Sequence, residues 1–238
     1  TINKINVIRG PLYIPTRPNG LGRTLQNISF GIFIIPVLLY FIILKKPSSM
    51  ISIVPSYSNS MLVILLGKLF RIQTIIHVQD LEFDLAQKLN LLPGIVCRLL
   101  FIIERIILTH ANIVSSISVK ILKEIKNKIK KDIPAILFPN WIDKASIYPD
   151  RKIGRVFRES LNICKDDFVI LYSGNIGYKQ GFDVIIKIAE KLGDNDKVKL
   201  LIVGAGAGVK DFLNIIYNKR LSKIIYKKPV EENILNKL

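Results

Sequence analysis

The sequence is poor in the residues that build disulfide-bonded or metal-held frameworks. Its 238 residues include two cysteines, two histidines and one tryptophan. Cys97 and Cys164 lie far apart, without a Cys-x-x-Cys pair, and no histidine stands at the spacing of metal ligands. This pattern argues against zinc or disulfide chemistry and predicts two buried, reduced thiols. We therefore expect a functional site without a metal.

The chain also lacks an uninterrupted apolar run as long as a membrane span. Its longest run, Phe30–Leu44, contains Gly31 and Pro36 and is followed by Lys45 and Lys46. A spanning helix needs about 20 apolar residues. The run therefore favours a buried helix, or one that lies against a membrane surface, over a crossing.

Acidic residues are outnumbered by basic ones. There are 35 Lys and Arg against 18 Asp and Glu, a formal net charge of +17, and half of the chain is hydrophobic. The excess suits anionic partners such as lipid head groups or phosphorylated substrates, and an AT-rich genome that enriches lysine is an equally open explanation. Aromatic residues are not interleaved with the lysines as stacking platforms, which argues against nucleic-acid binding.

One basic segment has helical periodicity. Ile121, Ile125 and Ile129 share one helical face, and lysines from Lys120 to Lys131 cover much of the remainder. Such a helix could lie on anionic lipid. An ordinary solvated face over a core stripe explains the same pattern, and both interpretations are open at this point.

Strand-like runs alternate with helix-length segments, which predicts an α/β fold of parallel sheets with right-handed crossovers. The expected strands are 50–54, 74–78, 112–116, 135–138, 168–173, 198–204 and 224–226, and the expected helices are 60–69, 93–108, 119–130, 180–192, 208–217 and the last residues. The alternation lapses between Phe138 and Phe168. We place a domain boundary near residue 145, which gives domains 1–145 and 146–238.

Both ends of the sequence look internal to a longer protein. Ile2–Ile8 alternates apolar and polar residues like a strand already under way, and Glu231–Leu238 stops inside a predicted helix. We therefore expect two incomplete domains, and we expect residues 1–238 alone to fold poorly and to have little activity.

The most informative segment is Leu171–Gly181, where an apolar run ends in glycines before an amphipathic helix. Gly174, Gly177 and Gly181 allow the backbone to approach an anion closely, and Lys179 is the nearest cation. The first N–H groups of a helix and its dipole also favour negative charge there. The segment predicts a site for a phosphorylated or nucleotide-linked substrate.

A second glycine-rich segment, Val203–Gly208, follows another predicted strand. Gly204, Gly206 and Gly208 are spaced as G-x-G-x-G, and no acidic residue follows at the distance that binds a ribose. These features argue against a nicotinamide dehydrogenase. Neither glycine segment contains Gly-Lys-Ser or Gly-Lys-Thr, which argues even more strongly against a P-loop nucleotidase.

Polar residues also follow the strand predicted at 74–78. His77 stands at its end, and Asp80, Glu82 and Asp84 come directly after it. A histidine beside carboxylates can hydrogen-bond sugar hydroxyls or transfer a proton. A half-buried histidine followed by solvated acids at a helix start is the alternative. His110, the other histidine, follows an apolar helix and is expected to be structural.

Six short motifs occur in order along nearly the whole chain. They are Pro55, Ile76–Asp80, Val114–Ser118, Phe138–Trp141, Tyr172–Gly177 with Lys179–Gly181, and Val203–Gly204. Together they resemble the family-four retaining glycosyltransferases. Within these the chain is most similar to the colanic acid biosynthesis glycosyltransferases and related aminosugar transferases.

The resemblance implies a GT-B fold, in which two Rossmann-like domains face a cleft. It implies that the first domain holds the acceptor and the second a nucleotide-sugar donor, without cofactor or metal. His77 matches a histidine that faces the donor sugar and the reacting centre. The implied donor-binding residues are Gly174, Asn175, Gly177, Lys179, Gln180, Gly181, Gly204 and Gly206, and the implied acceptor or sugar contacts are Asp80 and Glu82.

The donor loop departs from the family pattern. Many members have Arg at the position of Asn175 and Lys at that of Gln180, and Lys179 falls one residue early. A shift of one residue at a helix start turns a side chain by about 100°. We expect a metal-independent sugar transfer, with retention, to a lipid-linked saccharide in bacterial surface polysaccharide synthesis (capsule, exopolysaccharide or O-antigen), at the cytoplasmic face of the membrane. The alternative is a basic, membrane-associated scaffold with a decayed nucleotide-sugar site.

Overall fold

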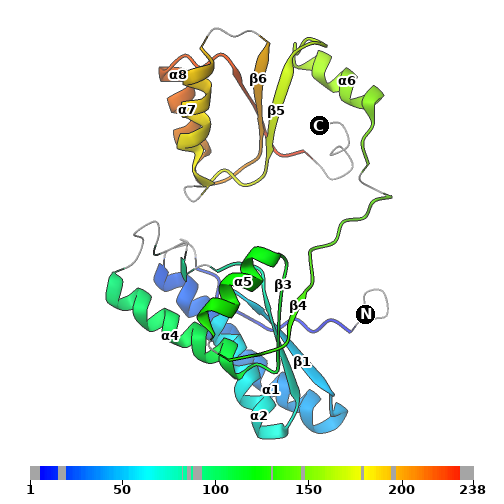
Figure 1. The fold of residues 1–238 in the computed structure, drawn as a ribbon, viewed down its shortest axis with the longest axis vertical. Coiled ribbons are helices and arrows are strands. Elements are labelled where there is room, and N and C mark those ends of the chain that lie inside the picture. The colour runs from blue at the N-terminus through cyan, green and yellow to red at the C-terminus, as the bar shows by residue number, and fades with distance from the viewer. Residues whose placement is uncertain are drawn as a thin grey trace. The chain divides into compact units, whose positions relative to one another are not determined.

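The chain folds into two compact α/β units. The computed structural model describes residues 6–15, 20–81, 83–84, 87, 93–129, 131–145, 148–177, 180–193 and 197–230. The units comprise Thr1–Asn140 and Trp141–Leu238, named here unit 1 and unit 2 (Figure 1). The division thus falls between Asn140 and Trp141, where the sequence analysis placed it near residue 145.

Unit 1 contains a parallel sheet with the strand order β1-β2-β3-β4. Its strands are β1 (Ser49–Val54), β2 (Gln73–Val78), β3 (Ile113–Ser116) and β4 (Ala135–Leu137), and its helices are α1 (Gly20–Lys45), α2 (Tyr57–Phe70), α4 (Gly94–His110) and α5 (Val119–Lys128). Because consecutive strands are neighbours and a helix joins each pair, every crossover advances the sheet by one strand. All four strands correspond to runs expected from the sequence.

The core of unit 1 lies between one face of this sheet and its crossover helices. Ile76, Val78 and Val114 are buried there against residues such as Ile107 of α4 and Ile125 of α5. Alternate residues of β1 are exposed, including Ile51 and Ile53. The two sheet faces therefore have different environments, and His77 lies on the face away from this core because its neighbours Ile76 and Val78 point into it.

Helix α1 is longer than the apolar run that suggested it. It extends over 26 residues and includes Pro36. By length and composition alone, Leu25–Lys45 could cross a membrane, and only 6% of its most apolar stretch is buried. The expectation of a helix buried in the protein interior was therefore wrong, since only one side of α1 packs on α2 and β1, through residues such as Ile42.

Helix α5 decides between the two interpretations of the basic segment. Ile125 is fully buried, and Ile121 packs against the same core. The apolar stripe thus faces the protein interior and the lysines form a solvated face. Cys97 is buried as expected, whereas the expectation for Cys164 was wrong, because this residue is exposed in the turn after α6.

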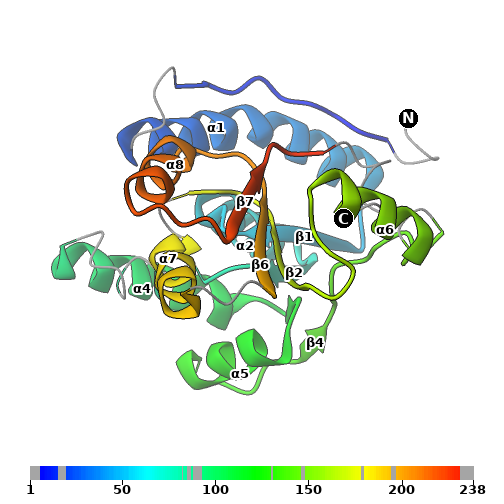
Figure 2. The ribbon, with the colours of Figure 1, turned by 90° about the horizontal axis from the view of Figure 1, so that it is seen from above.

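Unit 2 contains a parallel sheet with the order β5-β6-β7. Its strands are β5 (Phe168–Ser173), β6 (Val198–Val203) and β7 (Ile224–Lys227), and its helices are α6 (Arg151–Ser160), α7 (Phe182–Leu192) and α8 (Val209–Asn218). Helices α7 and α8 lie together on one side of the sheet and α6 lies on the other (Figures 1 and 2). Ile186 of α7 and Phe212 of α8 close the core over β6.

Two local expectations differ from the structure. Helix α6 was not predicted, although Asp150 caps it by accepting from the backbone N–H groups of Lys152 and Ile153, at 2.9 and 3.1 Å. An aspartate before an amphipathic stretch is a helix-start signal that could have revealed it. The strand expected over Ile2–Ile8 is absent from its described part, residues 6–8. There the chain runs beside α1, where the Tyr13 N–H donates to Ser29 Oγ (Figure 2).

Candidate functional site

His77 lies next to the carboxyl end of β2 and is nearly buried, with 6% of its surface exposed. Its Nδ1 is 3.0 Å from Oγ of Ser115, its register partner on β3. The ring of Phe138 meets the imidazole edge-on, with centroids 5.7 Å apart. Burial lowers the pKa of His77, because the charged imidazolium loses hydration. The ring is therefore neutral at pH 7 and presents one donor and one acceptor nitrogen.

The segment after β2 is fastened to the helices beneath it. Phe83 stacks on Tyr57 of α2 with ring centroids 4.3 Å apart, and Asp84 pairs with Lys128 of α5. Lys128 also pairs with Glu104 of α4, which is 1% exposed and accepts from Tyr57 Oη at 2.6 Å. Sequence analysis missed this network, because its members are far apart in the chain. It fixes the direction in which the chain leaves the end of β2.

Of the two carboxylates expected near His77, only Asp80 lies within the described residues. Asp80 is exposed just beyond the end of β2. Glu82 lies outside the described residues. The structure therefore places one of the two expected acceptor contacts at the end of the strand.

In unit 2, the loops after β5 and β6 bond directly to each other. The Gly174 N–H donates to Val203 O at 3.0 Å, and the Ile176 N–H donates to Ala205 O at 2.7 Å. Ile176 O in turn accepts from the Gly208 N–H at 2.9 Å. These bonds extend the parallel pairing of β5 and β6 beyond the strand ends. The two glycine segments identified from the sequence thus form one structure.

Glycine is required where these loops touch. A Cβ atom on Gly204 would lie 1.9 Å from Gly174 O, and one on Gly206 would lie 2.2 Å from Ile176 O. Gly206 also has φ of +155°, which side-chain-bearing residues rarely adopt. Gly174 differs, because the nearest atom to its added Cβ would be Tyr172 Oη at 3.4 Å. The close approach of two backbones therefore explains the glycines of the second loop.

The loops border a cavity of about 300 Å³ at the carboxyl ends of β5 and β6. It is lined by Ser173, Gly174, Asn175, Val203, Gly204, Ala205, Pro229 and Val230. A parallel sheet binds ligands at this edge, outside the carboxyl ends of its strands. The cavity has the position and the backbone-rich lining expected of an anion site.

The remaining donor-loop residues follow this cavity toward α7. Gln180 packs against Gly177, where an added Cβ would lie 2.7 Å from Gln180 Oε1. Gly181 begins α7 in the left-handed conformation, with φ of 65°, and no side chain caps the helix there. Lys179 lies outside the described residues. Among the described residues, no group of three or more His, Cys, Asp or Glu side chains could hold a metal ion.

Comparison with known proteins gives a family match within unit 2. A family described as "Glycosyl transferases group 1" matches residues 155–236, which contain both glycine loops. The chain is also 35% identical over 216 residues to WcaI of Escherichia coli (strain K12), whose name assigns it to colanic acid biosynthesis as a glycosyl transferase. The chain carries a group 1 glycosyl transferase domain. The match to WcaI covers 85% of this chain and 50% of WcaI, so the chain spans about half the length of this curated relative.

Solved glycosyltransferase structures share the fold around this group 1 domain. Sucrose-phosphate synthase from Thermosynechococcus elongatus matches with a TM-score of 0.67 at 14% identity, over 94% of this chain and 55% of that chain. HepE from Anabaena, in complex with UDP-glucose, matches with a TM-score of 0.61 at 12% identity, over 90% and 54%. These likenesses establish the fold class, GT-B, as expected from the sequence motifs.

Proposed function

We propose that the protein containing this chain transfers a sugar, with retention, from a nucleoside diphosphate sugar to a lipid-linked saccharide acceptor in surface polysaccharide synthesis. The carrying observation is the pair of interlocked glycine loops at the carboxyl ends of β5 and β6, inside the group 1 domain. The naming of WcaI for colanic acid biosynthesis and the UDP-glucose bound to HepE support the donor and the pathway class.

In this proposal, unit 2 holds the donor diphosphate by its backbone. Close contact of the two loops at Gly204 and Gly206 holds them together, and the cavity that the loops border is where a phosphate can approach the main chain. The uncapped start of α7 adds N–H groups and the positive end of a helix dipole. Such fixed dipoles stabilise the charge that develops on the leaving diphosphate, as a metal ion would.

His77 is the proposed catalytic residue of unit 1. With Nδ1 held by Ser115 Oγ, a neutral ring can use Nε2 to hydrogen-bond a hydroxyl of the donor sugar. The retained anomeric configuration and the lipid-linked acceptor are part of the same proposal. Asp80 and Glu82 are the residues proposed to contact the acceptor or the sugar.

In the same proposal, the protein lies on a membrane, at the cytoplasmic face. Helices α1, α2 and α4 support the membrane partner. Helix α2 packs on both of the others, and each helix exposes large apolar side chains. They include Ile28, Ile32 and Ile43 of α1, Leu65 and Leu69 of α2, and Ile95, Leu99, Ile102 and Ile106 of α4. Helices α1 and α2 contain no acidic residue, and the only one in α4, Glu104, is buried. An apolar, acid-free face with arginines beside it suits an anionic lipid surface.

Calorimetry with UDP and GDP on the full-length protein tests the donor proposal. Binding of either nucleotide is expected, and binding of neither would favour the non-catalytic, membrane-associated scaffold. Turnover with the matching nucleotide sugar, followed by NMR of the anomeric proton, tests retention. His77→Ala should lower kcat about a hundredfold, the low end of general acid-base contributions, and leave nucleotide affinity unchanged. His110→Ala, the exposed histidine, is the control.

A further inference from the structure

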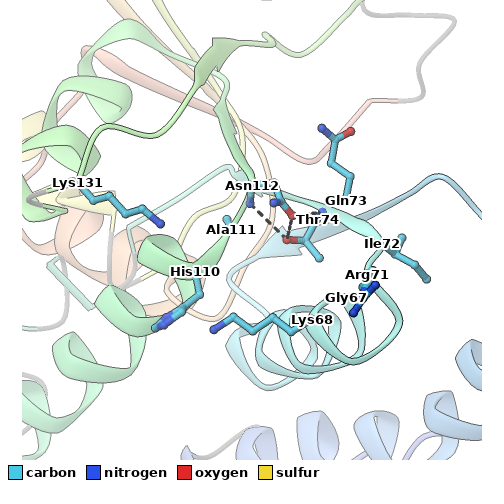
Figure 3. Close-up of a pocket in the computed structure, with 10 residues that line it drawn as sticks. All are labelled: Gly67, Lys68, Arg71, Ile72, Gln73, Thr74, His110, Ala111, Asn112 and Lys131. Atoms are coloured by element: carbon cyan, nitrogen blue, oxygen red, sulfur yellow. Dashed lines mark hydrogen bonds between the residues drawn. The ribbon is translucent and has the colours of Figure 1, made fainter.

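A second cavity lies in unit 1, at the amino ends of the strands (Figure 3). His77 lies near the carboxyl end of β2. It has a volume of about 630 Å³ and forms where α2 and α4 end and β2 and β3 begin. Its lining comprises Gly67, Lys68, Arg71, Ile72, Gln73, Thr74, His110, Ala111, Asn112 and Lys131. No residue proposed for sugar transfer contributes to it, so its lining calls for a separate explanation.

The lining of this cavity is basic. It includes Lys68, Arg71, His110 and Lys131 and no acidic residue. In the part of the chain that the structure describes, Lys68, Arg71 and Lys131 form no ion pair. Figure 3 shows Lys68 and Lys131 extending toward His110 from different elements. Within the described ranges, therefore, no carboxylate pairs with these three cations.

Helix dipoles account for part of this charge but not for all of it. Lys68 lies in the last turn of α2 and His110 in that of α4, where the helix ends are partly negative. Arg71 and Lys131 lie beyond the ends of the helices. They add two further positive charges at the same cavity. Such a surplus is expected of a site for an anion with more than one charge.

Asn112 adds neutral donors. Its Oδ1 accepts from the Thr74 N–H at 2.8 Å and from Thr74 Oγ1 at 3.0 Å. Because a backbone N–H can only donate, the amide oxygen must face Thr74. The NH₂ group of Asn112 is consequently turned away from Thr74 and available to an acceptor.

Arg71 occupies a backbone position that favours glycine. Its φ is 55° and its ψ is 40°, and its backbone N–H donates to Gly67 O. Gly67 itself approaches β2 so closely that an added Cβ would lie 2.2 Å from Thr74 Cγ2. The rim of the cavity is thus rigid, and an arginine stands where the backbone alone would select glycine.

We propose that this cavity is a second anion site, which binds a phosphate or diphosphate group. A guanidinium fork, two ammonium groups and an amide suit several charged oxygens at once better than they suit a single carboxylate. The group can belong to a soluble phosphorylated compound or to the head group of an anionic lipid. The site lies at the amino ends of the strands, so its ligand is distinct from the nucleotide-sugar donor. It goes beyond the proposed transfer reaction and does not depend on it.

Two variants remove the anion site without disturbing the fold. Arg71→Gly deletes the guanidinium and suits the left-handed backbone, so its melting temperature should match the wild type. Asn112→Asp keeps the acceptor for Thr74 and replaces the NH₂ donor with a negative oxygen. Matched controls exist in unit 2, where Arg220 has φ of 52° and Asn218 is exposed at the end of α8. Arg220→Gly and Asn218→Asp make the same changes of charge and shape away from the cavity.

Full-length protein is titrated with inorganic pyrophosphate by calorimetry in the presence of saturating UDP, which occupies the proposed donor site. It is also sedimented with vesicles of phosphatidylcholine with or without phosphatidic acid. Binding to pyrophosphate, or to vesicles only when phosphatidic acid is present, is expected, and the probe that binds identifies the source of the phosphate. Either signal should weaken at least about tenfold in Arg71→Gly and Asn112→Asp, the loss of one charge-assisted hydrogen bond, and remain in both controls. UDP binding should be unchanged in all four variants. Failure of both probes, or equal loss in variants and controls, overturns the proposal.

Discussion

Unit 1 has a candidate site at the carboxyl end of β2, and unit 2 has one at the carboxyl ends of β5 and β6. Both sites lie at the ends of parallel strands, yet they are built differently. The candidate site at β2 is a side chain, His77, which is buried and held by Ser115. The candidate site at β5 and β6 is formed by the backbone, and Gly204 and Gly206 leave no space there for a Cβ. A backbone site needs positions without a Cβ atom, whereas the properties of a side-chain site are set by the residues that surround the side chain. The two should therefore respond differently to substitution.

The largest effect is expected in unit 2. Gly204→Ala would place a Cβ 1.9 Å from Gly174 O and force the two loops apart. We expect a loss of about 3 kcal/mol of unfolding free energy, at the upper end for overpacking, together with loss of UDP binding. Urea unfolding and calorimetry measure the two effects. Gly174→Ala is the matched control for stability alone, because its added Cβ meets only the Tyr172 side chain, at 3.4 Å or more. Equal UDP affinity in Gly204→Ala and the wild type would contradict a backbone site.

A smaller loss of unfolding free energy is expected when the ion pairs of Lys128, beneath the end of β2, are removed. Lys128→Met leaves the buried Glu104 carboxylate without its cation. We expect a loss of about 2 kcal/mol in the unfolding free energy of unit 1, less than for a fully buried pair, because Lys128 remains partly exposed. Lys123→Met, on the solvated face of α5, should leave stability unchanged. UDP binding by unit 2 should survive in both, and its loss in Lys128→Met alone would show that the two sites are not independent.

The pH dependence of stability tests the burial of His77. Burial lowers the pKa of His77 in the folded state, so the unfolded chain binds the extra proton first as the pH falls below about 6.5. The free energy of unfolding should therefore decrease as the pH falls below this value and through the lowered pKa. Denaturant unfolding between pH 7.5 and pH 5, roughly either side of the unfolded pKa, measures the slope. His77→Gln should flatten this slope, and an unchanged slope in His77→Gln would argue against a buried neutral ring.

The smallest effect concerns a glycine that nothing contacts. An added Cβ on Gly154, inside α6, meets no atom within 4 Å. Gly154→Ala should raise the unfolding free energy of unit 2 by about 0.5 to 1 kcal/mol, because alanine loses less backbone entropy in a helix. Thermal or urea unfolding measures the gain. A destabilised Gly154→Ala would contradict the open space that the structure shows beside this residue.

Much of the fold could be predicted from the sequence. The runs that became β1 to β7 were recognised because they are short apolar stretches between turn residues. Helix α6 was missed, since its charged residues resembled a linker and its cap at Asp150 was not recognised. The length of α1 was underestimated, because Pro36 interrupts the apolar pattern but does not end the helix.

The candidate sites were predicted unequally. Gly174, Gly177, Gly204 and Gly206 were found because glycine at a strand end carries its own physical meaning, and the structure joins their loops. His77 was found, but its burial and its bond to Ser115 arise from strand register and could not be anticipated. The roles of all these residues stay predictions, and Lys179 and Glu82 lie outside the described residues. The basic cavity escaped notice, since Lys68, Arg71, His110 and Lys131 come from separate elements.

By itself the sequence determined the alternation of strands and helices, the positions of the glycine loops and the excess of positive charge. Periodicity and glycine runs can be seen in short stretches of the chain, and net charge is a sum over all its residues. Only the tertiary structure decided which loops meet, which histidine is buried, and which lysines gather around one cavity. Strand pairing brings residues from distant parts of the chain together, and no local pattern records which will become neighbours. The glycines beside Gly174 were therefore visible in advance, whereas the neighbours of Arg71 appeared only in the fold.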